Sequence, residues 1–161
     1  MTMPRQYLLD TNVLSETRKR RADEAVLAFL EAAEPSRLFI SVLALGELRK
    51  GVVLKMSDDS EGAKAIGSWV DGLELSFADR IVGIDTAMAR LWGELSAQRS
   101  RPVVDTLLAA TAIVHDLTLV TRNEKDVMDV PSLMLLNPWT SKGTRGQVRS
   151  EPRNRGHAVI S

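Results

Sequence analysis

Short apolar runs that suit β-strands alternate along this sequence with longer segments whose apolar residues recur every three or four positions. The runs occupy residues 6–9, 38–40, 81–84, 117–121 and 133–136. Strands that alternate with helical patterns are typical of βαβ units and of a mainly parallel sheet. The alternation therefore predicts an α/β fold with a central, mainly parallel five-stranded sheet flanked by helices.

The composition changes after Trp139. Residues 140–161 contain five lysines and arginines, three glycines and a single acid, Glu151. A segment with so little apolar content cannot bury enough surface to offset the entropy of folding. Because a chain of 161 residues is most simply one domain, we expect a globular domain over 1–139 and a flexible basic tail over 140–161.

The bulk composition excludes several functional classes. Lys plus Arg and Asp plus Glu both number 21, so a nucleic-acid partner must be met by local basic patches. The absence of cysteine excludes disulfides and thiolate zinc sites. No apolar stretch approaches the ~18 residues of a membrane span, and no signal peptide is evident. These features predict a cytoplasmic protein without a membrane partner.

Polar residues follow the predicted strands at one edge of the sheet. Asp10 ends the first strand, Asp105 lies near the start of a helix, and Asn123 and Asp126 follow the fourth strand. Ligands of open parallel sheets bind beyond the carboxyl ends of the strands. Glu47 lies in a predicted helix among apolar and small neighbours, which indicates partial burial and hence a partner for its charge.

Each of these residues also has an ordinary structural explanation. Asp10 and Asp105 could cap helices, Glu47 could pair with a nearby cation, and Asn123 could be a turn residue. Together, however, they supply several oxygen ligands without a histidine or cysteine cluster, which suits Mg²⁺ or Mn²⁺. A hard cation of this kind can activate a bound water to attack a phosphodiester.

Other catalytic templates are missing from the sequence. It has no G-x-S-x-G, Walker A or G-x-G-x-x-G motif, and its only histidines are His115 and His157. A haloacid-dehalogenase-like phosphatase with Asp10 as nucleophile would need a second aspartate where this chain has Asn12. A non-catalytic signalling module with an acidic Mg²⁺ pocket would need adjacent acids after the first strand. Metal-assisted hydrolysis is the leading hypothesis.

Two groups of cations are candidates for contacts with an RNA backbone. One is a run of four consecutive residues and the other lies beside Glu47; together they comprise Arg18, Lys19, Arg20, Arg21, Arg49 and Lys50. Phosphate contacts by such residues would make binding depend on salt. The alternative is an ordinary solvated surface.

Four segments in this order resemble the PIN domain, specifically the VapC/FitB-like toxins of bacterial toxin–antitoxin pairs. They are LLDTNVLSE at 8–16, the segment 41–51 ending in GELRKG, VDTLLAATA at 104–112, and LVTRNEKDV at 119–127. The resemblance covers roughly residues 6–139. It implies a PIN-like three-layer sandwich and an endoribonuclease that arrests translation.

The resemblance also implies a site and partners. It implies an acidic pocket for Mg²⁺ or Mn²⁺ with Asp10, Glu47 and Asp105 as its carboxylate core. It further implies an RNA substrate, a homodimer, and a hetero-oligomer with a cognate antitoxin whose C-terminal segment occupies the RNA groove. The sequence leaves the RNA that is cut undetermined.

One departure from the family pattern leaves the number of metal ions open. Many members have an acid where this chain has Asn123, although an asparagine is also frequent there. Asp126 could supply that carboxylate, or Asn123 could bind through its amide oxygen or a water. Thr11, Asn12 and Thr121 could orient the ligands, or the two threonines could support caps and turns. The sequence leaves two roles for Glu16, one at the outer edge of the acidic pocket and one as an ordinary surface charge.

Overall fold

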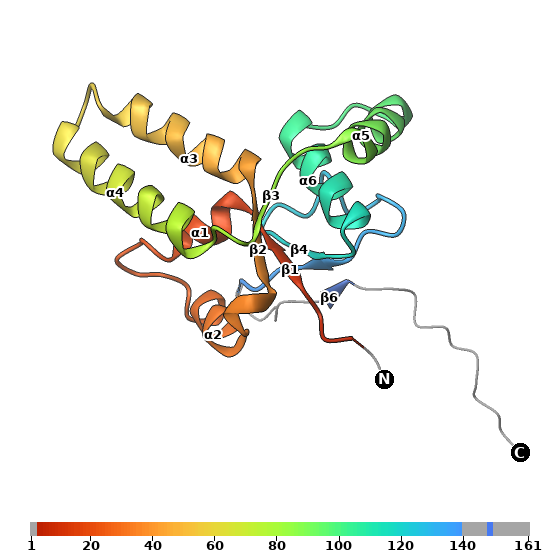
Figure 1. Cartoon of the computed structure of the whole chain (residues 1–161), viewed down its shortest axis with the longest axis horizontal. Coiled ribbons are helices and arrows are strands. Elements are labelled where there is room, and N and C mark those ends of the chain that lie inside the picture. Colours follow the sequence, from red (N-terminus) through yellow and green to blue (C-terminus); the bar gives the residue numbers. More distant parts are fainter. Residues whose placement is uncertain (1–2, 140–147, 150–161) are drawn as a thin grey trace, which may run out of the picture.

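A computed structural model of the chain (Figure 1) describes residues 3–139 and the backbone of residues 148–149. Most of the predicted tail, 140–147 and 150–161, lies outside the described residues. One sheet has the strand order β3-β2-β1-β4-β5-β6. Its strands are β1 (Tyr7–Leu9), β2 (Leu38–Ser41), β3 (Ile81–Val82), β4 (Thr118–Val120), β5 (Leu135–Leu136) and β6 (Val148–Arg149).

The first five strands are all parallel, which confirms the predicted sheet. In the central strand, Tyr7 is in register with Leu38 of β2 on one side and with Thr118 of β4 on the other. The sixth strand was not predicted. It pairs antiparallel to β5 and falls in the segment that we had expected to be a flexible tail.

Helices cover both faces of this sheet, so the molecule has three layers (Figure 1). They are α1 (Thr11–Glu16), α2 (Glu24–Ala32), α3 (Val42–Lys55), α4 (Ser60–Ser76), α5 (Thr86–Gln98) and α6 (Val103–Val114), with a 3-10 turn at Pro35–Arg37. Side chains of Asp23, Ser41 and Asp85 accept backbone N–H groups at the starts of α2, α3 and α5. These caps explain why the helices begin where they do.

Alternate residues of each central strand enter different cores. Leu8 and Leu119 pack with α5 and α6, whereas Leu9 and Val120 pack with α1 to α4. Burial on both faces explains why these strands are continuous apolar runs in the sequence. The two cores confirm the predicted three-layer sandwich.

The connections of the sheet create a crevice between β1 and β4. The chain runs outward from β1 through β2 to β3, and then returns to place β4 on the other side of β1. A reversal of this kind leaves the carboxyl ends of the two strands open to a ligand. Asp10 closes β1 at this point, and its backbone N–H donates to the Val120 carbonyl at 2.9 Å.

Within the part of the chain that the structure describes, no helix is both long enough and apolar enough to span a membrane.

Candidate active site

Asp10 is the most buried of the acids at this edge, with 6% of its surface exposed. One carboxylate oxygen accepts the Thr11 backbone N–H at 2.7 Å. The other accepts the Thr121 hydroxyl at 2.7 Å and the Asn12 amide at 3.2 Å. Burial raises the pKa of Asp10, and these three hydrogen bonds oppose the rise. Asp10 therefore caps α1 and is also fixed at the crevice.

Asp105 lies in the first turn of α6 and is half-buried, while the N-terminal cap position of this helix is Pro102. Its pKa is raised from 3.8 to about 6, first by burial and then by the negative charges of Asp10, Asp126 and Glu47. Carboxylates affect one another in this way only when they are close together. The structure thus brings all four predicted acids into one electrostatic cluster.

Asn123 links two of these acids. Its side-chain N–H₂ group donates to Asp105 at 3.1 Å and, more weakly, to Asp126 at 3.5 Å. Its own backbone N–H donates to the Thr121 hydroxyl at 3.0 Å. With this orientation the amide nitrogen faces the carboxylates, which favours an organising role for Asn123 over a metal contact through its amide oxygen.

Glu47 is exposed, so the predicted partial burial was wrong. Ala44 and Leu48 of α3 face the core, but Gly46 and Gly51 leave the space beside Glu47 open, since a Cβ atom there would meet nothing within 4 Å. The Thr11 hydroxyl donates to Glu47 at 2.9 Å. Thr11 thus holds Glu47 with its hydroxyl and Asp10 with its backbone N–H.

The acids form a loose cluster and not a closed cage. Within residues 3–139, no three acidic or histidine side chains are arranged to hold a metal ion together directly. The donors available are all oxygens, which suits a hard cation. Because Mg²⁺ keeps several waters and binds through one or two carboxylates, the cluster fits a hydrated ion of this type.

Two of the six candidate RNA-binding cations are already engaged within the protein. Arg49 was expected to be exposed, but it donates to Asp71 and Glu74 of α4 at 2.5 and 2.8 Å. These partners raise the pKa of Arg49. Lys19 pairs with Glu16 at 2.8 Å. Contact of Arg49 and Lys19 with RNA stays a prediction. These ion pairs argue against it, because both side chains already have acidic partners.

The other four cations, Arg18, Arg20, Arg21 and Lys50, are exposed. Arg18 lies over the Trp69 ring, 5.2 Å from its centroid. All four remain candidates for contacts with a phosphate backbone.

Glu16 is only 4% exposed and is not a surface charge. It accepts the Asp23 backbone N–H at 3.0 Å in addition to its ion pair with Lys19. The hydrogen bond from Lys19 is the main reason that the pKa of Glu16 is lowered. These bonds hold the turn between α1 and α2 in place, where the cation run lies.

Sequence reasoning missed the contacts that hold the loop carrying Asp126. Arg99 donates to both carboxylate oxygens of Asp129, at 2.8 and 2.9 Å, and to the Asp126 carbonyl at 3.1 Å. Arg101 reaches the same aspartate at 3.2 Å and also donates to the Leu95 carbonyl. The partners are about 30 residues apart, and no local pattern in the sequence pairs them.

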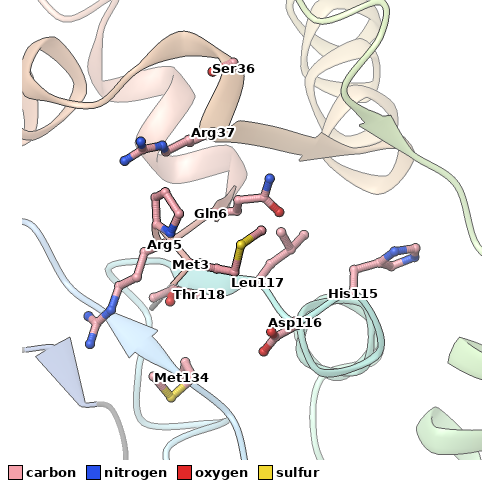
Figure 2. Close-up of a pocket in the computed structure, with 11 residues that line it drawn as sticks. Met3, Arg5, Gln6, Ser36, Arg37, His115, Asp116, Leu117, Thr118 and Met134 are labelled. Atoms are coloured by element: carbon pink, nitrogen blue, oxygen red, sulfur yellow. The ribbon is translucent and has the colours of Figure 1, made fainter. Parts of the chain in front are cut away.

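A cavity of about 550 Å³ lies at the opposite edge of the sheet. Figure 2 shows that it is surrounded by residues that precede four strands, among them Gln6, Arg37, Leu117 and Met134. None of the clustered acids lines it. The acidic edge between β1 and β4 is therefore the candidate active site.

Comparison with known proteins identifies the family of this chain. The PIN domain profile matches residues 7–130. Plasmid stability protein StbB of Pseudomonas syringae pv. tomato is 30% identical over 142 residues, covering 82% of this chain and 97% of that protein. VapC ribonuclease Y4jK of Sinorhizobium fredii is 31% identical over 138 residues, covering 82% and 96%.

Solved structures agree with these relatives. The crystal structure of FitAcB from Neisseria gonorrhoeae matches with a TM-score of 0.76 at 27% identity, over 84% of this chain and 100% of that chain. VapBC2 of Rickettsia felis, bound to a promoter DNA fragment, matches with a TM-score of 0.63 at 26% identity, over 83% and 98%. The chain belongs to the PIN domain family.

Proposed function

We propose that this protein is a metal-dependent endoribonuclease that acts as the toxin of a toxin–antitoxin pair. The observation that carries the proposal is the convergence of four carboxylates at one edge of the sheet, where hydrogen bonds fix Asp10 and Asn123 links Asp105 to Asp126. Burial and the three neighbouring carboxylates raise the pKa of Asp105 to about 6. Such a concentration of negative charge at a sheet edge opposes folding unless a cation relieves it. Names of relatives, such as VapC ribonuclease Y4jK, support RNA as the substrate.

The metal ion in this proposal is Mg²⁺ or Mn²⁺. Asp10 and Asp105 would hold it directly, and Glu47 and Asp126 would hold it through water. The ion would supply Lewis-acid activation of a water nucleophile and stabilisation of negative charge on the phosphate oxygens.

The chain's own residues fix the acids before the substrate arrives. Asp10 is held by three donors, and Asn123 spaces Asp105 and Asp126 by donating to both. Fixed groups of this kind need little rearrangement as the reaction proceeds. The exposed cations of the turn after α1 and Lys50 would neutralise RNA phosphates, so that binding weakens as salt rises.

The proposed partners follow from the names of similar structures. FitAB is described as bound to a DNA fragment, and another match is described as a toxin–antitoxin complex from Klebsiella pneumoniae. We extend this to a cognate antitoxin that inhibits the present protein, and to a homodimer as the active form. An RNA substrate in a bacterial cell would place the protein in the cytoplasm.

The test is cleavage of single-stranded RNA by the purified protein with Mg²⁺ or Mn²⁺, with EDTA as the metal-free arm. Asp10→Asn and Asp105→Asn should each lose most of the activity, whereas Asp58→Asn, at an exposed position remote in sequence from the site, should retain it. Equal residual cleavage by all four proteins would mean a contaminating nuclease and a wrong site.

The phosphatase alternative has a separate test. Asn12 donates its amide to Asp10 at 3.2 Å and occupies the place where that chemistry needs a second acid. A covalent phosphoryl group trapped on Asp10 would support the phosphatase and contradict the nuclease. The signalling alternative would be supported if Asp10→Ala left growth arrest by the expressed protein intact.

A further inference from the structure

A second cavity, of about 320 Å³, opens between α1, α3 and α4 beside the acids. We propose that this cavity, the α1–α3–α4 pocket, holds a nucleobase next to the scissile phosphate of a single-stranded RNA. The inference rests on the proposed function and adds a specificity site to it. The residues that carry the argument are Thr11, Ser15, Arg18, Glu47, Gly51 and Trp69.

The pocket is continuous with the acidic cluster. Thr11 and Glu47 line the pocket, and the Thr11 hydroxyl donates to Glu47 at 2.9 Å. The backbone N–H of the same threonine donates to Asp10 at 2.7 Å. An RNA phosphate placed at Asp10 therefore has a neighbouring nucleotide within reach of this pocket. Its volume is at the small end of ligand pockets, which run from roughly 300 Å³ upward.

The far wall of the pocket is a stacked pair of side chains. Arg18 is exposed and lies over the half-buried ring of Trp69, 5.2 Å from its centroid. Aromatic rings and guanidinium planes are the two surfaces on which proteins stack unpaired RNA bases. Trp69 supports the Arg18 guanidinium from one side, so a base would stack on the other side of the guanidinium.

The pocket holds one cation, Arg18, and one carboxylate, Glu47, which belongs to the acidic cluster. No carboxylate in the described part of the chain lies within ion-pairing distance of Arg18, so its charge is available to a phosphate. The Ser15 hydroxyl also lines the pocket and makes no hydrogen bond to another described residue, which leaves it for a base edge. The Arg18 guanidinium, which offers both a plane and a charge, and the Ser15 hydroxyl suit the base and the phosphate of a nucleotide.

Gly51 allows a variant that closes the pocket without harming the fold. It lies within α3, and a Cβ atom there would meet nothing within 4 Å. Gly51→Leu adds a good helix former and fills the pocket. Gly93→Leu on α5 is the matched control, because Gly93 is also helical, exposed and free of neighbours within 4 Å.

The experiment compares full and abasic RNAs. A randomised single-stranded 15-mer pool is first cleaved by the wild-type protein with Mg²⁺ or Mn²⁺, and a preferred site is identified by sequencing. RNAs that lack one base at each position flanking this site are then compared by kcat/KM. One missing base should lower kcat/KM of the wild type about 5- to 150-fold, the size of a lost base–aromatic stack.

The variants should not respond to that missing base. Gly51→Leu and Trp69→Ala should cleave the full RNA as slowly as the wild type cleaves the abasic one, and the missing base should cost them nothing further. Arg18→Lys, which keeps the charge but loses the plane, should show part of the loss, and Trp69→Phe should restore much of the activity. Gly93→Leu should behave as the wild type does.

Three outcomes would overturn the proposal. If each missing base lowered kcat/KM by the same factor for the wild type and for Gly51→Leu, the pocket would hold no base. The ribonuclease function would still stand. If Gly51→Leu cleaved RNA normally but no longer bound the cognate antitoxin, the pocket would be a protein-binding site. If the wild type cleaved none of the pool, the proposed function itself would fall.

Discussion

The Thr121 hydroxyl donates to the Asp10 carboxylate at 2.7 Å and joins the ends of two neighbouring strands, although the residues are 111 positions apart. Both side chains are almost completely buried. The bond therefore fixes Asp10 from the β4 side while Thr11 fixes it from α1. The acid at the centre of the site depends on the pairing of β1 with β4.

We expect Thr121→Val to destabilise the protein by about 1–3 kcal/mol at neutral pH, because a buried carboxylate loses a donor. The same hydrogen bond lowers the pKa of Asp10 against the effect of burial, so that pKa should rise further. Since the bond favours the ionised form, the loss should shrink as the pH falls through the raised pKa of Asp10. Urea denaturation between pH 4 and 8 measures this.

The control for this prediction is Thr111→Val. Thr111 is fully buried in α6, and its hydroxyl donates to the Leu107 carbonyl one turn earlier, away from any of the acids. Its effect on stability should not change with pH. A pH-independent loss at Thr121 as well would contradict a direct role of the hydroxyl in holding the Asp10 charge.

Asp105→Asn should stabilise the metal-free protein at pH 8. Its folded-state pKa of about 6 lies above the ordinary value of 3.8, so the folded state binds a proton more readily than the unfolded chain. The resulting stability is present below about pH 4 and is lost as the pH rises through 6, by roughly 1–2 kcal/mol once solvent screening of this half-buried group is allowed for. Asparagine carries no charge and avoids this loss.

Thermal denaturation in EDTA at pH 4, 6 and 8 tests the prediction. The gain from Asp105→Asn should be largest at pH 8 and vanish near pH 4. Added Mg²⁺ should stabilise the wild type at pH 8 and the variant much less, because a ligand of the folded state raises its stability. A variant that is less stable than the wild type at pH 8 in EDTA would show that Asp105 is not under electrostatic strain.

Much of this site could be predicted from the sequence because its parts are local. Asp10 directly follows an apolar strand, and Asn123 and Asp126 lie three and six residues after the end of another, so the parallel sheet brings them to one edge. The predicted fold was also correct, since apolar runs buried on both faces are distinctive of parallel sheets.

Other features depend on contacts that no local pattern records. Glu47 is exposed because no other element packs against this side of α3, where a Cβ atom at Gly46 or Gly51 would also meet nothing within 4 Å. The pairing of Arg49 with α4 and of Arg99 with Asp129 joins residues more than 20 positions apart. The antiparallel strand β6 lies within residues 140–161, whose composition does not predict a strand.

Asp126→Asn should lower the pKa of Asp105. The negative charge of Asp126 is one of the causes that raise this pKa, after burial and Asp10. Removing it leaves the Asp105 carboxylate easier to ionise. Carbon-13 NMR titration of the Asp105 side chain in metal-free protein measures the change without reference to activity.

Asp58→Asn serves as the control for this titration, because Asp58 is exposed and is not among the charges that act on Asp105. The titration midpoint of Asp105 should be the same in this variant and in the wild type. An unchanged midpoint in Asp126→Asn would place Asp126 outside the cluster and would leave Asn123 alone to complete the site.

The last prediction concerns Asn123, the residue that links two acids of the cluster. Its amide donates to Asp105 at 3.1 Å and to Asp126 at 3.5 Å, and its hydrogen bond lowers the pKa of Asp105. Asn123→Asp replaces that donor by a further negative charge. The variant should therefore be less stable than the wild type in EDTA at pH 8, and the pKa of Asp105 should rise above 6.

The same variant should bind Mn²⁺ more tightly, because the added carboxylate is a better ligand for a hard cation than an amide nitrogen. Isothermal titration with Mn²⁺ at pH 8 compares the two proteins, and Asn123→Ala separates loss of the amide from gain of charge. The alanine variant should lose stability without gaining affinity. Equal Mn²⁺ affinity in all three proteins would show that residue 123 lies beyond the reach of the ion.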